Sequence, residues 1–281
     1  MEPIEIEAKT LIQKSKTPSN DYVINPYTGC VLGCAYCFAS FASFASFASF
    51  ASFAGRQFGR SVKEWGDYLY VKKNAVELAR KELAKMPQDK RRGTMLLSSV
   101  TDPYQGHETK YRLTRGILRE LQAVECPGLV RILTKSPVVT RDIDLLTSLP
   151  RAEVGMTVTT TDDKVSRWLE VRAPLASHRL RTLAELNEAG IPTYAFVGPL
   201  LPHFATQPEL LDDLFGRLVE AEIGGRCSWS TSTSSGTSAS AWTRCSPTSP
   251  KTSGRHTSRR GRVSTANSST RSWRSCCTST G

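Results

Sequence analysis

Between residues 67 and 222 the chain alternates short β-branched runs with amphipathic stretches of helical period. The runs predict strands at 68–72, 94–100, 130–134, 153–159 and 191–197, followed by helices at 74–86, 109–124, 138–148, 177–189 and 208–222. Repeated strand–helix units with short connections fold into a parallel α/β sheet covered by helices. A full or partial barrel fits this pattern better than a flat sheet, although the pattern alone does not decide. Active sites of such barrels lie at the carboxyl ends of the strands.

Three cysteines, Cys30, Cys34 and Cys37, lie within eight residues in the spacing C-x3-C-x2-C. One loop with this spacing can bring three thiolates to one centre. A structural zinc site normally has four protein ligands, and the other candidates, Cys126 and His107, are far along the chain. Three soft thiolates with an open fourth position suit a [4Fe–4S] cluster with one unligated iron. A zinc site completed by a distant residue is the alternative.

With Tyr36 directly before the last cysteine, this motif resembles the C-x3-C-x-aromatic-C signature of radical S-adenosylmethionine (SAM) enzymes. Further segments are similar to the spore photoproduct lyase-like, or DNA repair photolyase-like, branch: NPYTGC (25–30), TDPYQ (101–105) with Glu108, LTKSP (133–137), RDIDLL (141–146), AGIP (189–192) and PLLP (199–202). The resemblance covers about residues 5–225 and excludes the Phe-Ala-Ser repeat at 38–55 and the tail. It implies a (β/α)6-type barrel with a [4Fe–4S] cluster held by the three cysteines.

In that family the fourth iron binds SAM, and an electron from the cluster cleaves SAM to a 5′-deoxyadenosyl radical. The resemblance therefore implies a lyase-like radical SAM enzyme, SAM as a cofactor, and an electron donor such as flavodoxin or ferredoxin. Tyr36, Thr101, Lys135 and Thr157 are the expected SAM-binding residues. Each has a structural alternative: Thr101 and Asp102 could cap a helix or form a turn, and Lys135 could be a solvated charge.

Glu170 and Arg172 match a family segment Glu-Pro-Arg-x-Pro in which Val171 replaces the proline here. Arg172 could bind a carboxylate of SAM or of the substrate with two donors, or form a structural pair with a glutamate. Spore photoproduct lyases use a cysteine near the second strand end to return a hydrogen atom, and the comparable residue here is Ser99. A serine O–H bond is too strong for that step, and Cys126 follows a helix at the opposite end of the barrel. DNA is thus an expectation from the resemblance alone.

The net charge of +11 belongs mostly to residues 226–281, which hold nine Lys and Arg and no Asp or Glu; residues 1–225 carry only +2. This tail has 17 Ser and 11 Thr but no Leu, Ile, Phe, Tyr or Met. Such a composition predicts disorder. The composition is also typical of a GC-rich gene read out of frame. In that case we expect the barrel to lack its last strand. A genuine low-complexity tail is the alternative.

The basic tail allows a second hypothesis, a non-catalytic metal-binding protein whose tail binds nucleic acid. Scattered arginines would contact phosphates without sequence preference and lose affinity with salt, and Trp229, Trp242 and Trp273 could stack on bases. A charged tail without a partner is the competing interpretation. The near-neutral body offers no phosphate-binding stripe.

We divide the chain into an N-terminal extension (1–20), a core (21–225) and the tail (226–281). The core is interrupted by a Phe-Ala-Ser repeat at 38–55, whose period of three fits neither a strand nor a helix. We expect a tolerated apolar insertion, helical and prone to self-association; a membrane-surface helix is the alternative. No run approaches the roughly 20 apolar residues of a membrane span, and the N-terminus lacks the features of a signal peptide. The expected location is the reducing cytoplasm.

Overall fold

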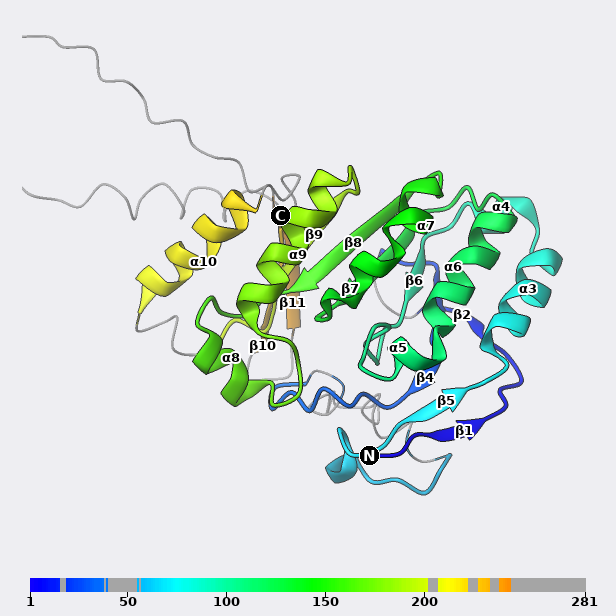
Figure 1. Ribbon diagram of the computed structural model, residues 1–281, viewed down its shortest axis with the longest axis horizontal. Helices are drawn as coiled ribbons and strands as arrows, with labels where there is room; N and C mark the ends of the chain where they lie inside the picture. Colours follow the sequence, from blue (N-terminus) through cyan, green and yellow to red (C-terminus); the bar gives the residue numbers. More distant parts are fainter. Residues whose placement is uncertain are drawn as a thin grey trace, which may run out of the picture.

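The computed structural model describes residues 1–15, 19–37, 39, 55, 57–201, 207–221, 227–232 and 238–243. Its main sheet has eight strands in the order β11-β10-β9-β8-β7-β6-β3-β2 (Figure 1). Neighbouring strands from β3 to β10 are parallel, and β2 and β11 are antiparallel at the two edges. The strands are β2 (Ile12–Lys14), β3 (Tyr22–Ile24), β6 (Met95–Leu97), β7 (Val130–Thr134), β8 (Ala152–Thr157), β9 (Thr193–Val197), β10 (Cys227–Ser232) and β11 (Ser238–Thr243). In the described part of the chain the edges do not pair with each other, so the sheet is a partial barrel.

Helices cover one face of this sheet (Figure 1). They are α3 (Ala75–Lys85), α4 (Gln88–Arg91), α5 (Glu108–Tyr111), α6 (Leu113–Ala123), α7 (Ile143–Ser148), α8 (Asp163–Leu169), α9 (Ala176–Glu188) and α10 (Pro208–Glu220), with 3-10 turns η1 (Val62–Glu64) and η2 (Pro137–Asp142). Alternate residues of β7, Val130 and Ile132, are buried in one core with Ile117 and Leu121 of α6. The α/β class and the partial barrel predicted from the sequence are confirmed. Among the described helices, none is long and apolar enough to cross a membrane.

A second, small sheet has the order β1-β5-β4, formed by β1 (Ile4–Ile6), β5 (Tyr70–Lys72) and β4 (Tyr27–Thr28). The sequence predicted a strand at 68–72 as the first of the parallel sheet, and this placement is wrong: β5 belongs to the small sheet. The first parallel strand is β3, which has three residues and is too short to show a period. The N-terminal extension contributes β1 and β2, and its separation from the core stays a prediction.

The helix predicted at 109–124 is broken at Arg112, whose φ of 52° is left-handed. The buried carboxylate of Glu108 accepts hydrogen bonds from the backbone N–H groups of Leu113 (3.0 Å) and Thr114 (3.1 Å). These donors begin α6 and have no partner within the helix. Glu108 thus caps the second half of the broken helix, a role that a helical period does not reveal.

The main sheet continues beyond residue 225 with β10, which differs from the expectation of a missing last strand. The disorder of the tail as a whole stays a prediction. In β10, Cys227 lies opposite Ala195 and Trp229 opposite Val197 of β9, in parallel register. A strand ladder is made by backbone groups, so a segment without aliphatic residues can extend an open edge. The rest of the tail, and the Phe-Ala-Ser repeat apart from Ala39 and Gly55, lie outside the described residues.

Gly155 in β8 provides a test of the sheet's inner packing. A Cβ at this position would lie 2.2 Å from Cζ of the Tyr194 ring, whose hydroxyl donates to the carbonyl of Ile132 (3.1 Å). We predict that Gly155→Ala lowers the free energy of unfolding by about 1–3 kcal/mol, because the ring must move. The control is Gly216→Ala in α10, where a Cβ has open space; it should raise stability by about 0.5–1 kcal/mol. Urea unfolding measures both, and equal effects would contradict this packing.

Candidate metal centre

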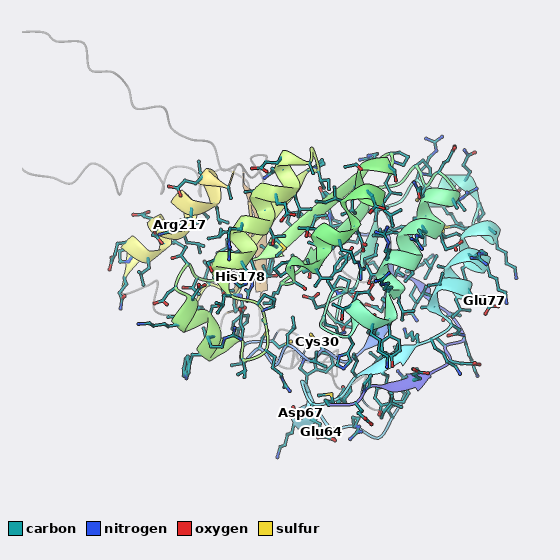
Figure 2. All side chains as sticks on the ribbon, viewed as in Figure 1. Cys30, Glu64, Asp67, Glu77, His178 and Arg217 are labelled. Carbon is teal, nitrogen blue, oxygen red and sulfur yellow. The ribbon has the colours of Figure 1, made fainter. Side chains whose placement is uncertain are left out.

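The three cysteines lie on the loop that follows β3 and β4. Figure 2 shows Cys30 between α8 and the small sheet. Two glycines beside them are in the left-handed region, Gly29 with φ 94° and Gly33 with φ 64°. A Cβ on Gly29 would lie 2.4 Å from the Tyr68 carbonyl oxygen. The loop can therefore turn sharply and approach its neighbours closely only because these positions are glycine.

Burial raises the pKa of the Cys30 thiol to about 12 and that of Cys34 to about 11. The nearby Asp102 adds to the shift of Cys30, whereas Lys135 opposes that of Cys34. A metal would favour the thiolate forms, since thiolates and not thiols are the ligands.

Among the described residues, no three His, Cys, Asp or Glu side chains are arranged to hold a single metal ion. In an iron–sulfur cube each thiolate binds a different iron, so the three sulfurs share a loop without meeting at one point. Three soft thiols on one constrained loop fit such a cluster. They do not form a ready-made tetrahedral site for one ion.

The cysteine loop is joined to the end of α8 by backbone contacts. Cys34 pairs with Glu170 in an isolated antiparallel bridge, and the N–H of Ala35 donates to the carbonyl of Leu169 (2.7 Å). The sequence did not predict α8, which begins after Asp162 caps its first turn. This short helix provides the platform on which the loop lies.

A fully buried ion pair between Glu170 and Arg179 lies beneath this bridge. Arg179 also donates to the carbonyl of Thr157 at the end of β8 (3.0 Å). The hydroxyl of Tyr36 donates to Glu170, and the Lys135 Nζ lies 3.9 Å from Glu170 Oε1 and 5.5 Å from the centre of the Tyr36 ring. Burial raises the pKa of Glu170, and Arg179 opposes this shift. Two predicted site residues, Tyr36 and Lys135, thus meet around one carboxylate, whose central position the sequence did not reveal.

Thr101 holds the cysteine loop from the other side. Its hydroxyl donates to the carbonyl of Gly29, next to Cys30, at 2.5 Å. Asp102 accepts from the Thr134 hydroxyl (2.6 Å) and from the backbone N–H of Lys135 (2.8 Å), which joins the carboxyl ends of two strands. Asp102 also closes a local turn, the structural alternative that the sequence left open.

Arg172 does not pair with Glu170, whose partner is Arg179. Its Nη2 donates to the carbonyl of Gly66 (3.0 Å) and to Asp67 (3.1 Å), and the side chain is 46% exposed. Arg172 therefore makes a structural contact between loops, which is one of its two expected roles. Its partner is Asp67 and not a glutamate. The guanidinium also lies against Gly33 of the cysteine loop.

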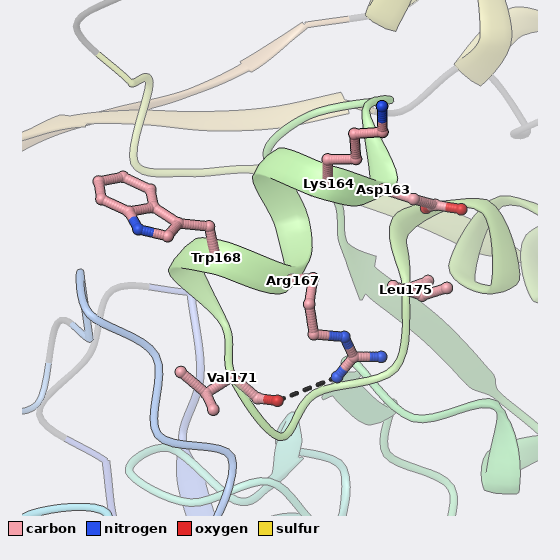
Figure 3. Close-up of a pocket in the computed structure, with 6 residues that line it drawn as sticks. All are labelled: Asp163, Lys164, Arg167, Trp168, Val171 and Leu175. Carbon is pink, nitrogen blue, oxygen red and sulfur yellow. Dashed lines mark hydrogen bonds between the residues drawn. The ribbon is translucent and has the colours of Figure 1, made fainter.

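An apolar surface that the sequence did not predict lies on α8 and the loop after it (Figure 3). Trp168 is 79% exposed and Val171 is 59% exposed. Arg167 donates to the carbonyl of Val171 (2.9 Å), which folds the chain back after α8. A shallow hollow here is lined by Asp163, Lys164, Arg167, Trp168, Val171 and Leu175.

The buried ion pair should dominate the stability of this region. We predict that Arg179→Met lowers the free energy of unfolding by about 3–5 kcal/mol, because it leaves the Glu170 carboxylate buried without its cation. The matched control is Arg217→Met, which removes an exposed pair with Asp213 (3.3 Å) and should cost about 0.5 kcal/mol or less. Urea unfolding at neutral pH compares the two; a loss at Arg179 as small as that at Arg217 would contradict the prediction.

Known proteins share sequence and fold with this chain. Uncharacterized protein MJ0683 of Methanocaldococcus jannaschii is 33% identical over 202 residues, which are 72% of this chain and 69% of that protein. Uncharacterized protein Rv2578c of Mycobacterium tuberculosis is 31% identical over 207 residues, 73% of this chain and 56% of that protein. The chain thus spans little more than half of the mycobacterial relative.

Among solved structures, spore photoproduct lyase complexed with dinucleoside spore photoproduct has a similar fold. The TM-score is 0.52 at 18% identity, covering 76% of this chain and 57% of that one. A family model of the radical SAM superfamily, whose members use a [4Fe–4S] cluster and SAM, matches residues 24–214, which include all three cysteines and Glu170. The chain therefore belongs to the radical SAM superfamily, with a fold like that of spore photoproduct lyase.

Proposed function

We propose that this chain is an enzyme that reductively cleaves SAM, with Cys30, Cys34 and Cys37 holding a [4Fe–4S] cluster. The observation that carries the proposal is the meeting of Tyr36 and Lys135 around the buried Glu170, directly beside Cys34. When bound, the cluster and SAM supply the reductive cleavage of a carbon–sulfur bond. The electron would come from a small carrier such as flavodoxin or ferredoxin in the reducing cytoplasm.

Lys135 is the residue best placed to bind the carboxylate of SAM. Its ammonium is 3.9 Å from Glu170, too far for a strong hydrogen bond, and its side chain is only 15% exposed. A carboxylate ligand would give this ammonium a charge-assisted hydrogen bond in a partly dry site. Thr157 lies nearby at the end of β8. Thr101 would affect SAM binding only indirectly, by holding the cysteine loop, because its hydroxyl donates to the carbonyl of Gly29.

The substrate stays unassigned, and the residues at the strand ends restrict the chemistry. Ser99 follows β6, with its N–H donating to Asn25 (3.0 Å). Cys126 is buried before the start of β7 and lies 3.6 Å from the carbonyl of Arg91. Neither residue offers a thiol at the site, so we propose that the reaction does not return a hydrogen atom from these positions. A damaged dinucleotide in DNA is the first substrate to test.

The cluster ligands can be tested one by one. After anaerobic reconstitution the chain should bind about four irons and form 5′-deoxyadenosine from SAM only with a reductant. Cys30→Ala, Cys34→Ala and Cys37→Ala should each lose most of the iron and all SAM cleavage. Cys126→Ala, which removes a thiol away from the loop, should keep both. Iron analysis and chromatography of nucleosides measure the two quantities.

The same experiment separates the alternative, a non-catalytic metal-binding protein with a nucleic-acid-binding tail. That hypothesis expects zinc instead of iron, no SAM cleavage, and nucleic-acid retention that disappears when residues 226–281 are deleted. Iron retained by all three cysteine variants would contradict both hypotheses.

Lys135 gives a prediction for SAM affinity. We expect Lys135→Met to weaken SAM binding about 10- to 100-fold, which corresponds to one charge-assisted hydrogen bond, while the iron content stays unchanged. Lys164→Met, on the surface of α8, is the matched control and should bind SAM like the wild type. Equilibrium dialysis with labelled SAM measures the Kd; equal values for the three proteins would exclude Lys135 as a SAM ligand.

A further inference from the structure

Trp65 contacts one of the predicted cluster ligands through its only polar atom. The indole Nε1 lies 3.2 Å from the Cys37 sulfur and donates a hydrogen bond to it. The two residues are 28 positions apart, on either side of the Phe-Ala-Ser repeat. This contact plays no part in the roles assigned above.

The indole ring is held by an aromatic wall built against the cysteine loop. Trp65 packs edge-to-face on Tyr68, with ring centres 5.9 Å apart and planes at 85°. Tyr68 is 2% exposed, and its ring and carbonyl occupy the space that a Cβ on Gly29 would need. The wall continues through Tyr70, on which Phe58 stacks at 3.8 Å. The ring therefore has little freedom to turn its N–H away from the sulfur.

A second contact fixes the backbone next to Trp65. Gly66 is left-handed with φ 103°, and a Cβ there would lie 3.4 Å from the Cα of Gly33. The Arg172 guanidinium donates to the Gly66 carbonyl (3.0 Å) and to Asp67 (3.1 Å). Arg172, from the loop after α8, thus clamps the tryptophan segment onto the cysteine loop. The donor is positioned from both sides, independently of any bound group.

We propose that Trp65 is a positioning residue that tunes the reduction potential of the cluster through the Cys37 sulfur; this rests on the proposed function. A hydrogen bond to a ligating thiolate withdraws electron density from the sulfur. It stabilises the reduced cluster, which carries one more negative charge, relative to the oxidised cluster. The indole N–H therefore makes the reduction potential less negative and lets a weaker donor reduce the site. A tryptophan that only covered the loop would act through its shape and not through its N–H.

The test uses the full reconstituted chain and measures the midpoint potential of the cluster by a redox titration followed with electron paramagnetic resonance. Trp65→Phe should shift the potential to more negative values. Replacing Trp65 by 3-benzothienylalanine, which keeps the shape of the ring and removes only the N–H, should shift it in the same direction. Trp168→Phe, on the exposed surface of α8, is the matched control and should leave the potential unchanged.

The outcomes separate this inference from the proposed function. A wild-type chain that takes up no cluster would overturn the proposed function and the inference with it. A wild-type chain that takes up the cluster, with the same potential when the indole N–H is removed, would overturn the inference alone. If Trp65→Phe fails to load, the benzothienylalanine protein decides, because its packing is preserved.

Discussion

The buried ion pair of Glu170 and Arg179 is the interaction on which the centre depends. Burying either charge alone in this dry position would be strongly unfavourable, so the two side chains must be buried as a pair. Each has further partners: the carboxylate accepts from Tyr36 and from Ser166 (3.1 Å), and the guanidinium donates to backbone carbonyls, that of Thr157 among them. One pair therefore joins β8, α8, α9 and the cysteine loop.

The loop is also held by contacts of a different kind. Thr101 binds the Gly29 carbonyl, and Arg172 fixes the Gly66 segment against Gly33. These contacts are neutral or partly exposed. Each therefore contributes about 1 kcal/mol to the free energy of unfolding, less than the loss expected when the buried pair is broken. Their effect is geometric, because a loop with two left-handed glycines keeps one shape only when its neighbours define it.

The sequence predicted those parts of the fold that local composition determines. The strand at 130–134 matches β7 because a β-branched run bounded by turn residues has a clear period. The cysteine spacing predicted three cluster ligands for a similarly local reason, because all three cysteines lie on one short loop. Strand β3 was missed because three residues show no period, and β10 because backbone pairing to an open edge does not need apolar side chains.

The side-chain partners could not be predicted, since they depend on how distant segments meet. Arg172 matched a family segment, yet the partner of Glu170 is Arg179, one helix further along. Trp65 and Cys37 are separated by the repeat, and no spacing rule relates them. Family motifs indicate which residues belong to a site, whereas the three-dimensional contacts indicate whether each holds the loop or faces the ligand.

We propose above that the constrained cysteine loop holds a cluster whose open iron binds SAM. The most direct measurement is the electron paramagnetic resonance spectrum of the reduced, reconstituted chain recorded with and without SAM. We expect a [4Fe–4S] signal whose g-values change when SAM is added, because SAM would bind the iron that lacks a cysteine. A spectrum that SAM leaves unchanged, from a chain with full iron content, would contradict it.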